Sequence, residues 1–169
     1  MALLRLIVFA LAACGQAGAQ PSATSGLSVP AGWIAIPEIA TAVTTAAKGD
    51  GITVDGAEAW GEPARGCYGV WLALTGEGAS AEQVLAGIAQ QPVTTSNIVK
   101  PEGADGLVTL SFETPAPAAA ATAPAATTYR GRLRARIAAG KITMLACFAN
   151  DREPTTCEGP CTTLLGGLP

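Results

Sequence analysis

The chain has 169 residues and a formal net charge of -3 at pH 7. This length fits one compact domain and excludes a large two-lobed enzyme. The acidic balance gives no global basic field and disfavours nucleic-acid binding. Histidine is absent, which removes the usual general base, the Ser-His-Asp and Cys-His catalytic arrangements and the commonest zinc ligand.

The N-terminal segment has the pattern of an export signal. Arg5 precedes an apolar run over residues 6–13, which is much shorter than the roughly 20 apolar residues of a transmembrane helix. Every later apolar stretch is broken by Gly, Pro or charged residues. We therefore expect no transmembrane helix in the mature chain.

Residues 11–14, Leu-Ala-Ala-Cys, resemble the lipobox of bacterial lipoproteins. In these proteins the signal is cut before the cysteine, so the resemblance implies a signal peptide over 1–13 and lipidation of Cys14, which would anchor the chain stably in a membrane. Gly15 after the cysteine resembles the outer-membrane type. The alternative is ordinary cleavage after Ala19, which follows small residues and would give a soluble periplasmic or secreted chain.

The exported part begins with a low-complexity stretch. Residues 14–28 are rich in Ser, Gly, Ala and Pro, which predicts a flexible tether before a single domain over 29–169. After Pro37, at a first-turn position, Ile39, Val43 and Ala47 recur at helical spacing. Gly49 then marks the end of the pattern. This pattern predicts a helix near 38–48.

The next elements alternate in periodicity. Residues 51–75 have a period of two around a breaker cluster at 61–66, which predicts a hairpin with both faces at least partly covered. Ser80 and Gln83 form a capping box ahead of an apolar stripe, which predicts a helix. Alternation over 106–113 predicts another strand.

The last part of the domain follows a segment without core-forming side chains. Residues 114–127 are almost wholly Ala, Pro and Thr and are predicted to be a mobile loop.

Residues 129–150 are then predicted to form a hairpin turning at Ala139-Gly140. Its register makes four apolar pairs on one face: Ile137 with Ile142, Ala135 with Met144, Leu133 with Ala146 and Gly131 with Phe148. The other face carries a row of arginines: Arg130, Arg132, Arg134 and Arg136. A short final element is expected at about 157–165.

Four cysteines follow Cys14: Cys67, Cys147, Cys157 and Cys161. An even number in an exported chain predicts two disulfides, with three pairings available. The expected strands favour a bridge between Cys67 and Cys147, which leaves Cys157 with Cys161 as a short loop bridge. The alternative joins Cys147 to one of the terminal pair. Without histidine or a C-x-x-C motif, zinc binding and thiol oxidoreductase activity are disfavoured, and no metal or cofactor is expected.

The order of elements is similar to that of the PsbP-like sandwich. The resemblance is carried by Pro30-Ala31-Gly32-Trp33 near the domain start, by Ala139-Gly140-Lys141-Ile142-Thr143 at the hairpin, and by the order of strands and helices over 29–168. It implies an α+β fold in which an antiparallel sheet has two or three helices packed on its faces. The family also occurs in small bacterial envelope lipoproteins, is mostly non-catalytic and binds other proteins, so the resemblance implies binding without naming a ligand.

The arginine row has two interpretations. Charge rows usually form a solvated or salt-bridged surface, and Glu113 on the preceding strand is an expected partner. The functional alternative is a docking face for an anionic envelope partner, either a phosphate-bearing lipid head group or an acidic protein, through bidentate guanidinium contacts.

Catalytic residues are not singled out by any spacing. Ser80 is explained as a helix cap, and the carboxylates Asp55, Glu58, Glu62 and Glu77 as surface and turn residues. We therefore expect no enzyme, and a small hydrolase is the least favoured function.

Together these patterns predict an envelope-anchored bacterial lipoprotein, located at the outer membrane and facing the periplasm, that acts as a non-enzymatic binding or assembly accessory. The expected partners are the membrane, through the lipid anchor, and an envelope protein or anionic ligand. The alternative is a soluble periplasmic or secreted binding or inhibitor module.

Overall fold

The computed structural model describes residues 24–49, 53–115, 128–150 and 154–168. The predicted signal peptide, the lipidation site Cys14, the tether up to residue 23 and the loop residues 116–127 lie outside the described residues. The predictions made for them stay predictions. Residues 114 and 115, assigned to the loop by sequence, belong instead to a strand.

The described residues form a seven-stranded antiparallel sheet with the strand order β1-β2-β3-β7-β6-β5-β4. Its strands are β1 (Ile34–Ala35), β2 (Thr53–Glu62), β3 (Cys67–Thr75), β4 (Thr94–Val99), β5 (Gly106–Pro115), β6 (Thr128–Ala138) and β7 (Lys141–Asn150). The α-helices of the described residues are α2 (Pro37–Gly49), α3 (Ala81–Ala89) and α4 (Glu158–Gly166). The predicted α+β class with an antiparallel sheet is confirmed.

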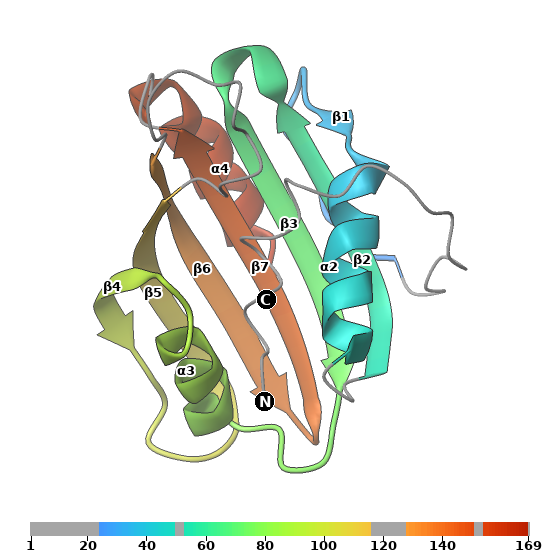
Figure 1. Ribbon diagram of the computed structural model, residues 1–169, viewed down its shortest axis with the longest axis vertical. Coiled ribbons are helices and arrows are strands. Elements are labelled where there is room, and N and C mark those ends of the chain that lie inside the picture. The colour runs from blue at the N-terminus through green and yellow to red at the C-terminus, as the bar shows by residue number, and fades with distance from the viewer. Residues whose placement is uncertain (1–23, 50–52, 116–127, 151–153, 169) are drawn as a thin grey trace.

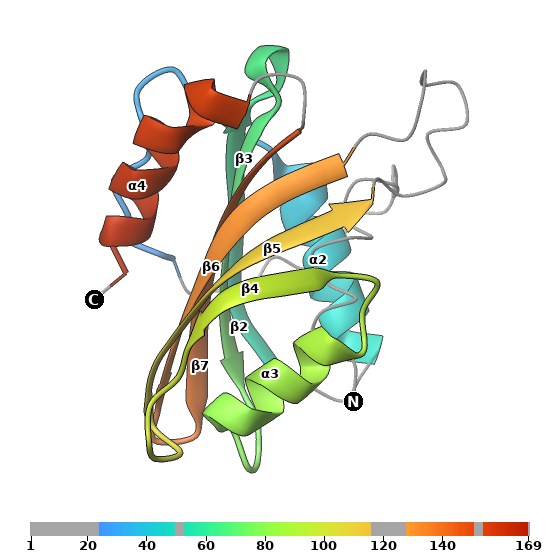
Figure 2. The same cartoon turned by 90° about the vertical axis from the view of Figure 1, so that its left-hand side faces the viewer.

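The helices divide the sheet into two differently covered faces. Helices α2 and α3 lie on one face, called here the two-helix face (Figure 1). Helix α4 lies on the opposite face, called here the α4 face (Figure 2). Both faces bury apolar side chains, because the sheet separates two clusters of buried residues. A sheet covered on both sides explains why the strand sequences carry apolar residues at positions of either parity.

The two-helix face holds the larger aliphatic cluster. Val43 of α2 and Val84 of α3 are fully buried, and both belong to the cluster that includes Leu72, Leu133 and Met144 of the central strands. Each helix contributes residues at helical spacing, as the sequence pattern predicted. Burial of this apolar area is the main favourable contribution to folding on this side.

Most of the predicted elements are found where they were expected. Helix α2 and the hairpin of β2 and β3 match the predicted segments, with a 3-10 turn η1 (Pro63–Arg65) in the breaker cluster. The β6–β7 hairpin has the predicted register throughout, and Ala139 and Gly140 take the positive φ of its tight turn. The final element is α4, preceded by a 3-10 turn η2 (Pro154–Cys157).

Strand β4 was not predicted. It is a sheet edge built from Thr94, Thr95, Ser96 and Asn97 before its apolar end, and it lacks the apolar alternation of a half-buried strand. The register with β5 shifts after Ser96, where Asn97 has a φ of 52°. Such a bulge bends an edge strand away from further pairing.

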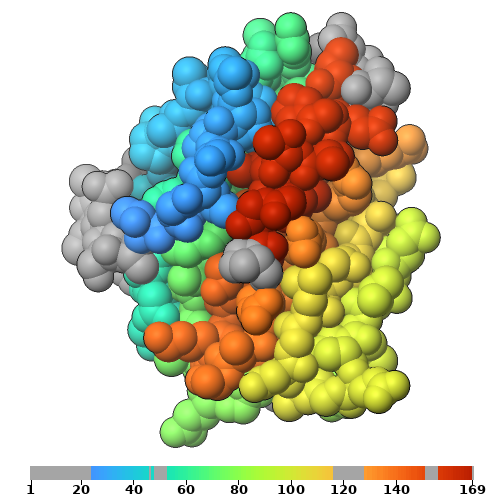
Figure 3. Space-filling view, turned by 180° about the vertical axis from the view of Figure 1, so that it is seen from behind, coloured from blue at the N-terminus to red at the C-terminus, as the bar shows by residue number. Residues whose placement is uncertain are grey.

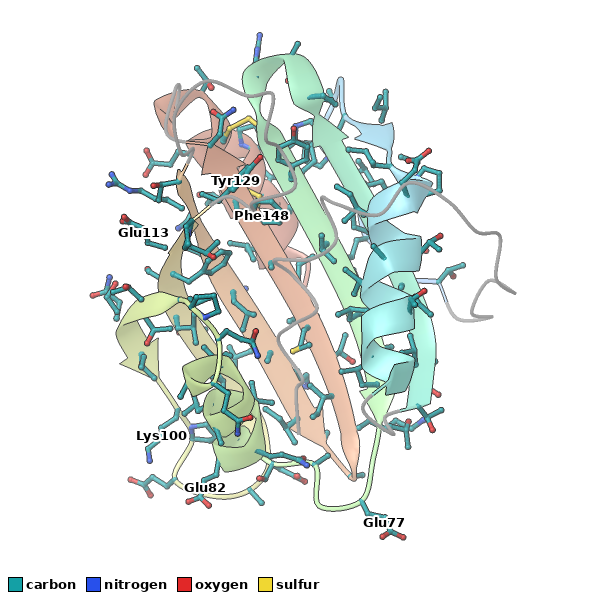
Figure 4. The ribbon with its side chains drawn as sticks, viewed as in Figure 1. Glu77, Glu82, Lys100, Glu113, Tyr129 and Phe148 are labelled. Atoms are coloured by element: carbon teal, nitrogen blue, oxygen red, sulfur yellow. A yellow bond between two sulfur atoms is a disulfide. The ribbon has the colours of Figure 1, made fainter. Side chains whose placement is uncertain are left out.

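An aromatic group closes one end of the two-helix face. Phe148 stacks on Tyr68 at a ring-centroid distance of 5.6 Å and meets Tyr129 edge-on at 5.8 Å; Figure 4 shows Tyr129 and Phe148 together near this end. A Cβ at Gly131 would lie 2.7 Å from a ring atom of Phe112 and 2.6 Å from Cβ of Phe148. The glycine therefore makes room for the rings across the strand.

The cap of α3 gives a test of the local fold. Ser80 accepts a hydrogen bond from the backbone N–H of Gln83 at 3.2 Å. We expect Ser80→Ala to lower the free energy of unfolding by about 1 kcal/mol, because one helix N–H loses its acceptor. Ser80→Asp retains an acceptor and should unfold like the natural chain. Urea unfolding with the disulfides intact measures both, and equal losses in the two variants would contradict the cap.

Candidate functional site

The α4 face is the most distinctive surface of the fold. Helix α4 packs beside the N-terminal described segment 24–33 over the sheet, and the two lie next to each other when the molecule is seen from behind (Figure 3). Beneath them is a buried cluster of aromatic, aliphatic and cysteine side chains: Trp33, Trp60, Trp71, Leu145, Leu164, Leu165, Leu168 and the four cysteines.

Two disulfides fasten α4 to adjacent strands. Cys157 is bonded to Cys67 at the start of β3, with a Cα–Cα distance of 5.6 Å. Cys161 is bonded to Cys147 of β7, with a Cα–Cα distance of 5.5 Å. The prediction of two disulfides from these four residues is confirmed. The favoured pairing was wrong, because neither Cys67 with Cys147 nor Cys157 with Cys161 is a bridge; the Cys147–Cys161 bridge belongs to the alternative that remained open.

The helical conformation of the C-terminal segment explains the error. Cys157 is the N-cap of α4, and Cys161 lies four positions later on the same side of the helix. Side chains at this spacing have Cβ atoms about 5–6 Å apart, whereas a disulfide needs about 3.5–4.5 Å. Gly159 and Pro160 suggested a turn, but a proline in the first helical turn removes no intrahelical hydrogen bond.

Close approach of α4 to the sheet depends on Gly69 of β3. A Cβ at this position would lie 2.5 Å from Cδ2 of Leu164 and 3.0 Å from a ring atom of Trp33. Leu164 is fully buried and Trp33 is 8% exposed. The glycine therefore lets the helix and the N-terminal segment meet over β3.

The N-terminal segment is held by a carboxylate of β2. Ser25 donates its backbone N–H and its hydroxyl to the two carboxylate oxygens of Glu58, at 3.1 and 2.5 Å. Leu27 is half-buried against the cluster under α4. This part of the predicted tether, from Ser25 to Leu27, is therefore attached to the domain.

Half of the arginine row fastens α4. Arg132 donates to the hydroxyl of Thr162 at 2.9 Å, and Arg134 donates to the carbonyl oxygen of Leu165 at 2.7 Å. Leu165 is in the last turn of the helix, where the helix dipole favours a cation. Nε of Arg134 is buried without a hydrogen-bond partner, so this guanidinium is enclosed between helix and sheet.

The other two arginines point to solvent. Arg130 forms an exposed ion pair with Glu113 at 2.9 Å, the partner that sequence analysis expected. Arg136 is exposed and makes no hydrogen bond or ion pair within the described part of the chain. Across the sheet it lies between Leu107 and Thr143, which are half-buried. This end of the row is therefore the part available to a ligand.

Besides Glu113, which pairs with Arg130, the same face carries two acidic side chains on β2. By register, Glu58 and Glu62 lie on the α4 face opposite Trp71 and Cys67. Glu58 accepts from Ser25, and Glu62 pairs with Arg65 at 3.2 Å. The face thus has a basic side on β6 and an acidic side on β2, with α4 between them.

Several side chains that were considered as catalytic candidates make contacts that stabilise the fold. Ser80 caps α3, Glu58 holds the N-terminal segment, and Asp55 accepts a hydrogen bond from Thr75. Burial raises the pKa of the Tyr68 hydroxyl above its ordinary value. Within residues 24–49, 53–115, 128–150 and 154–168, no three potential metal-ligating residues are grouped, and no helix has the length and apolar character needed to cross a membrane.

Comparisons with family models, with curated proteins and with solved structures give no match to this chain.

Two matched arginine variants test how the row is used. Arg134→Ala removes a charged hydrogen bond to the end of α4 and should lower the free energy of unfolding by about 1–3 kcal/mol. Arg136→Ala removes the same charge without a contact and should stay within about 0.5 kcal/mol of the natural chain. Urea unfolding, together with amide exchange in α4, measures both effects. Equal stability of the two variants would show that Arg134 does not hold the helix.

Proposed function

We propose that this protein is an envelope-anchored bacterial lipoprotein that acts as a non-enzymatic binding or assembly accessory. It is held at the outer membrane, faces the periplasm and presents the α4 face to an anionic partner. The observation that carries the proposal is the pair of disulfides joining α4 to β3 and β7. Disulfides persist in oxidising compartments, so a domain closed in this way belongs outside the cytosol.

Anchoring is supported by the sequence before the domain. Arg5, the apolar run 6–13 and Cys14 together form an export signal that ends at a lipobox. Cys14 is also the one cysteine that is not needed for the two disulfides. The chain between Cys14 and Ser25 can reach at most about 40 Å, so an acylated Cys14 would keep the domain close to the membrane surface.

Binding is supported by the uneven use of the arginine row. Arg132 and Arg134 contact α4, and Arg130 is paired with Glu113, whereas Arg136 has no partner within the described residues. An exposed guanidinium beside half-buried sheet residues suits a phosphate or carboxylate group.

The architecture that we propose for the domain is the PsbP-like sandwich. It is supported by an antiparallel sheet with helices on both faces and by a hairpin turning at Ala139-Gly140. A mostly non-catalytic family that binds other proteins fits an accessory role.

The intact mass of the protein from its native membrane fraction tests the anchor. We expect a chain that begins at acylated Cys14 and that is lighter by four hydrogen atoms without reductant than with it, because two disulfides are present. Cys14→Ser should abolish the acylation and leave the disulfides unchanged. A chain that begins at Gln20 in the soluble fraction would instead establish a periplasmic or secreted module.

Charge reversal at the free end of the row tests the binding face. The probes are vesicles containing phosphatidylglycerol and a column of immobilised polyaspartate. On whichever probe retains the natural chain, Arg136→Glu should reduce that retention severalfold. Added salt should reduce the retention of the natural chain as well, because it screens the charges. Lys100→Glu, an equal charge change at an exposed residue off the row, should have little effect. Equal loss in both variants, or no retention of the natural chain on either probe, would contradict the proposed face.

A further inference from the structure

The two disulfides are interleaved along the sequence. Numbered in chain order, the first cysteine, Cys67, is bonded to the third, Cys157, and the second, Cys147, to the fourth, Cys161. The sequence separations are 90 and 14 residues. No bridge joins cysteines that are neighbours in this order, so oxidation cannot reach the native pairing by joining each cysteine to the next.

Loop closure favours other bridges in an unfolded chain. Cys157 and Cys161 are four residues apart, and Cys147 and Cys157 are ten apart, whereas the shorter native bridge closes over 14. The entropy lost on closing a flexible loop grows with its length. Among Cys147, Cys157 and Cys161, the native Cys147–Cys161 bridge is therefore the slowest of the three possible bridges to form. If either shorter bridge forms first, the cysteine that remains for Cys67 is not its native partner Cys157.

Helix α4 does not protect its cysteines before docking. It is nine residues long and contains two glycines and a proline. A helix of this length and composition is not stable alone in water. Cys157 and Cys161 are therefore flexible neighbours in the unfolded chain and become separated only when α4 packs on the sheet.

One non-native isomer is especially favourable. When Cys157 pairs with Cys161, Cys67 is left with Cys147, on the adjacent strand. In the finished sheet Cys67 is opposite Ala149 and Cys147 is opposite Gly69, so the two cysteines are diagonal neighbours on one face. Diagonal neighbours lie about 7–8 Å apart, outside the usual Cα–Cα range of a disulfide of about 4.4–6.8 Å. A loosely formed sheet can make this bridge, but the native sheet does not accommodate it.

We propose that this protein is a substrate of a thiol–disulfide isomerase of its compartment, which converts the isomer bridged Cys67–Cys147 and Cys157–Cys161 into the native one. The proposal rests on the export that the proposed function includes, because such enzymes act where disulfides form. The partner is defined by its chemistry: a protein with a reactive cysteine thiolate and affinity for an incompletely packed chain.

The rearrangement balances without an oxidant. The enzyme thiolate attacks Sγ of Cys67, the bond to Cys147 breaks, and Cys147 leaves as a thiolate. Cys147 attacks Sγ of Cys161, which forms the native bridge and releases the thiolate of Cys157. Cys157 then attacks Sγ of Cys67 and displaces the enzyme thiolate. Two non-native S–S bonds are broken, two native bonds are formed, and the enzyme is regenerated.

Refolding of the mature chain tests this proposal. Cys14→Ser leaves four thiols, and the reduced chain is refolded in a glutathione buffer with or without a purified C-x-x-C disulfide isomerase. Samples are blocked with iodoacetamide and digested with trypsin, which cleaves after Lys141 and Arg152, and with a protease that cleaves after glutamate, which separates Cys157 from Cys161 at Glu158. We expect the natural pairing as the linked peptides of Cys67 with Cys157 and of Cys147 with Cys161, and the trapped isomer as those of Cys67 with Cys147 and of Cys157 with Cys161. The isomerase should speed the conversion at least tenfold.

The control variant has no wrong partner. Cys147→Ala with Cys161→Ala leaves Cys67 and Cys157 as the remaining pair, so its oxidation should be no faster with the isomerase than with glutathione alone. Equal acceleration of this variant would overturn the proposal, as would direct formation of the native pairing in the four-cysteine chain without a trapped isomer. Because refolding does not depend on acylation, this result is independent of the mass measurement that tests the anchor.

Discussion

The α4 face depends on one covalent constraint, the two disulfides between a short helix and two adjacent strands. Helix α4 has too few residues, and too many helix-breaking ones, to be stable by itself. The two bridges close loops of 14 and 90 residues and so lower the conformational entropy of the unfolded chain. In the chain-entropy description this stabilises the folded state by about 3 kcal/mol for the shorter loop and about 4–5 kcal/mol for the longer one. The covalent links therefore stabilise a helix whose own sequence does not, and they fix which of its sides meets the sheet.

The helices on the two faces of the sheet are consequently held by different interactions. On the two-helix face, α2 and α3 contribute valine, isoleucine and alanine to a continuous aliphatic cluster, and burial alone accounts for their packing. On the α4 face the helix contributes two cysteines and two leucines, while Trp33, Trp60 and Trp71 fill the space beside it. The arginines of β6 complete this arrangement, because Arg134 donates to the carbonyl oxygen of Leu165 at the helix end, which also accepts from the backbone N–H of Leu168.

Local patterns in the sequence were sufficient for most elements of the fold. The alternation in residues 129–150 determined a register and its arginine face, because a shift of one residue would pair the apolar side chains of one strand with the arginines' side of the other. The capping box at Ser80 likewise marked a helix start. Strand β4 was missed, since an exposed edge has no buried side and hence no alternation. The disulfide pairing was missed for a different reason: it depends on where α4 lies on the sheet, and spacing along the chain does not determine that position.

The same dependence on tertiary position limits what the arginine row reveals by itself. Four arginines at alternate positions look equivalent in the sequence, but α4 accepts hydrogen bonds from the middle two, and Glu113 pairs with Arg130 at one end of the row. Arg132 and Arg134 already donate hydrogen bonds to residues of α4, so a ligand would have to compete with these bonds. At Arg136 it competes only with water, beside half-buried Leu107 and Thr143. The acidic side chains across α4, on β2, repel an anion from that side. The contacts of α4 with the middle of the row, together with the Arg130–Glu113 ion pair, thus leave Arg136 as the arginine that an anion can reach without displacing an existing contact of the described residues.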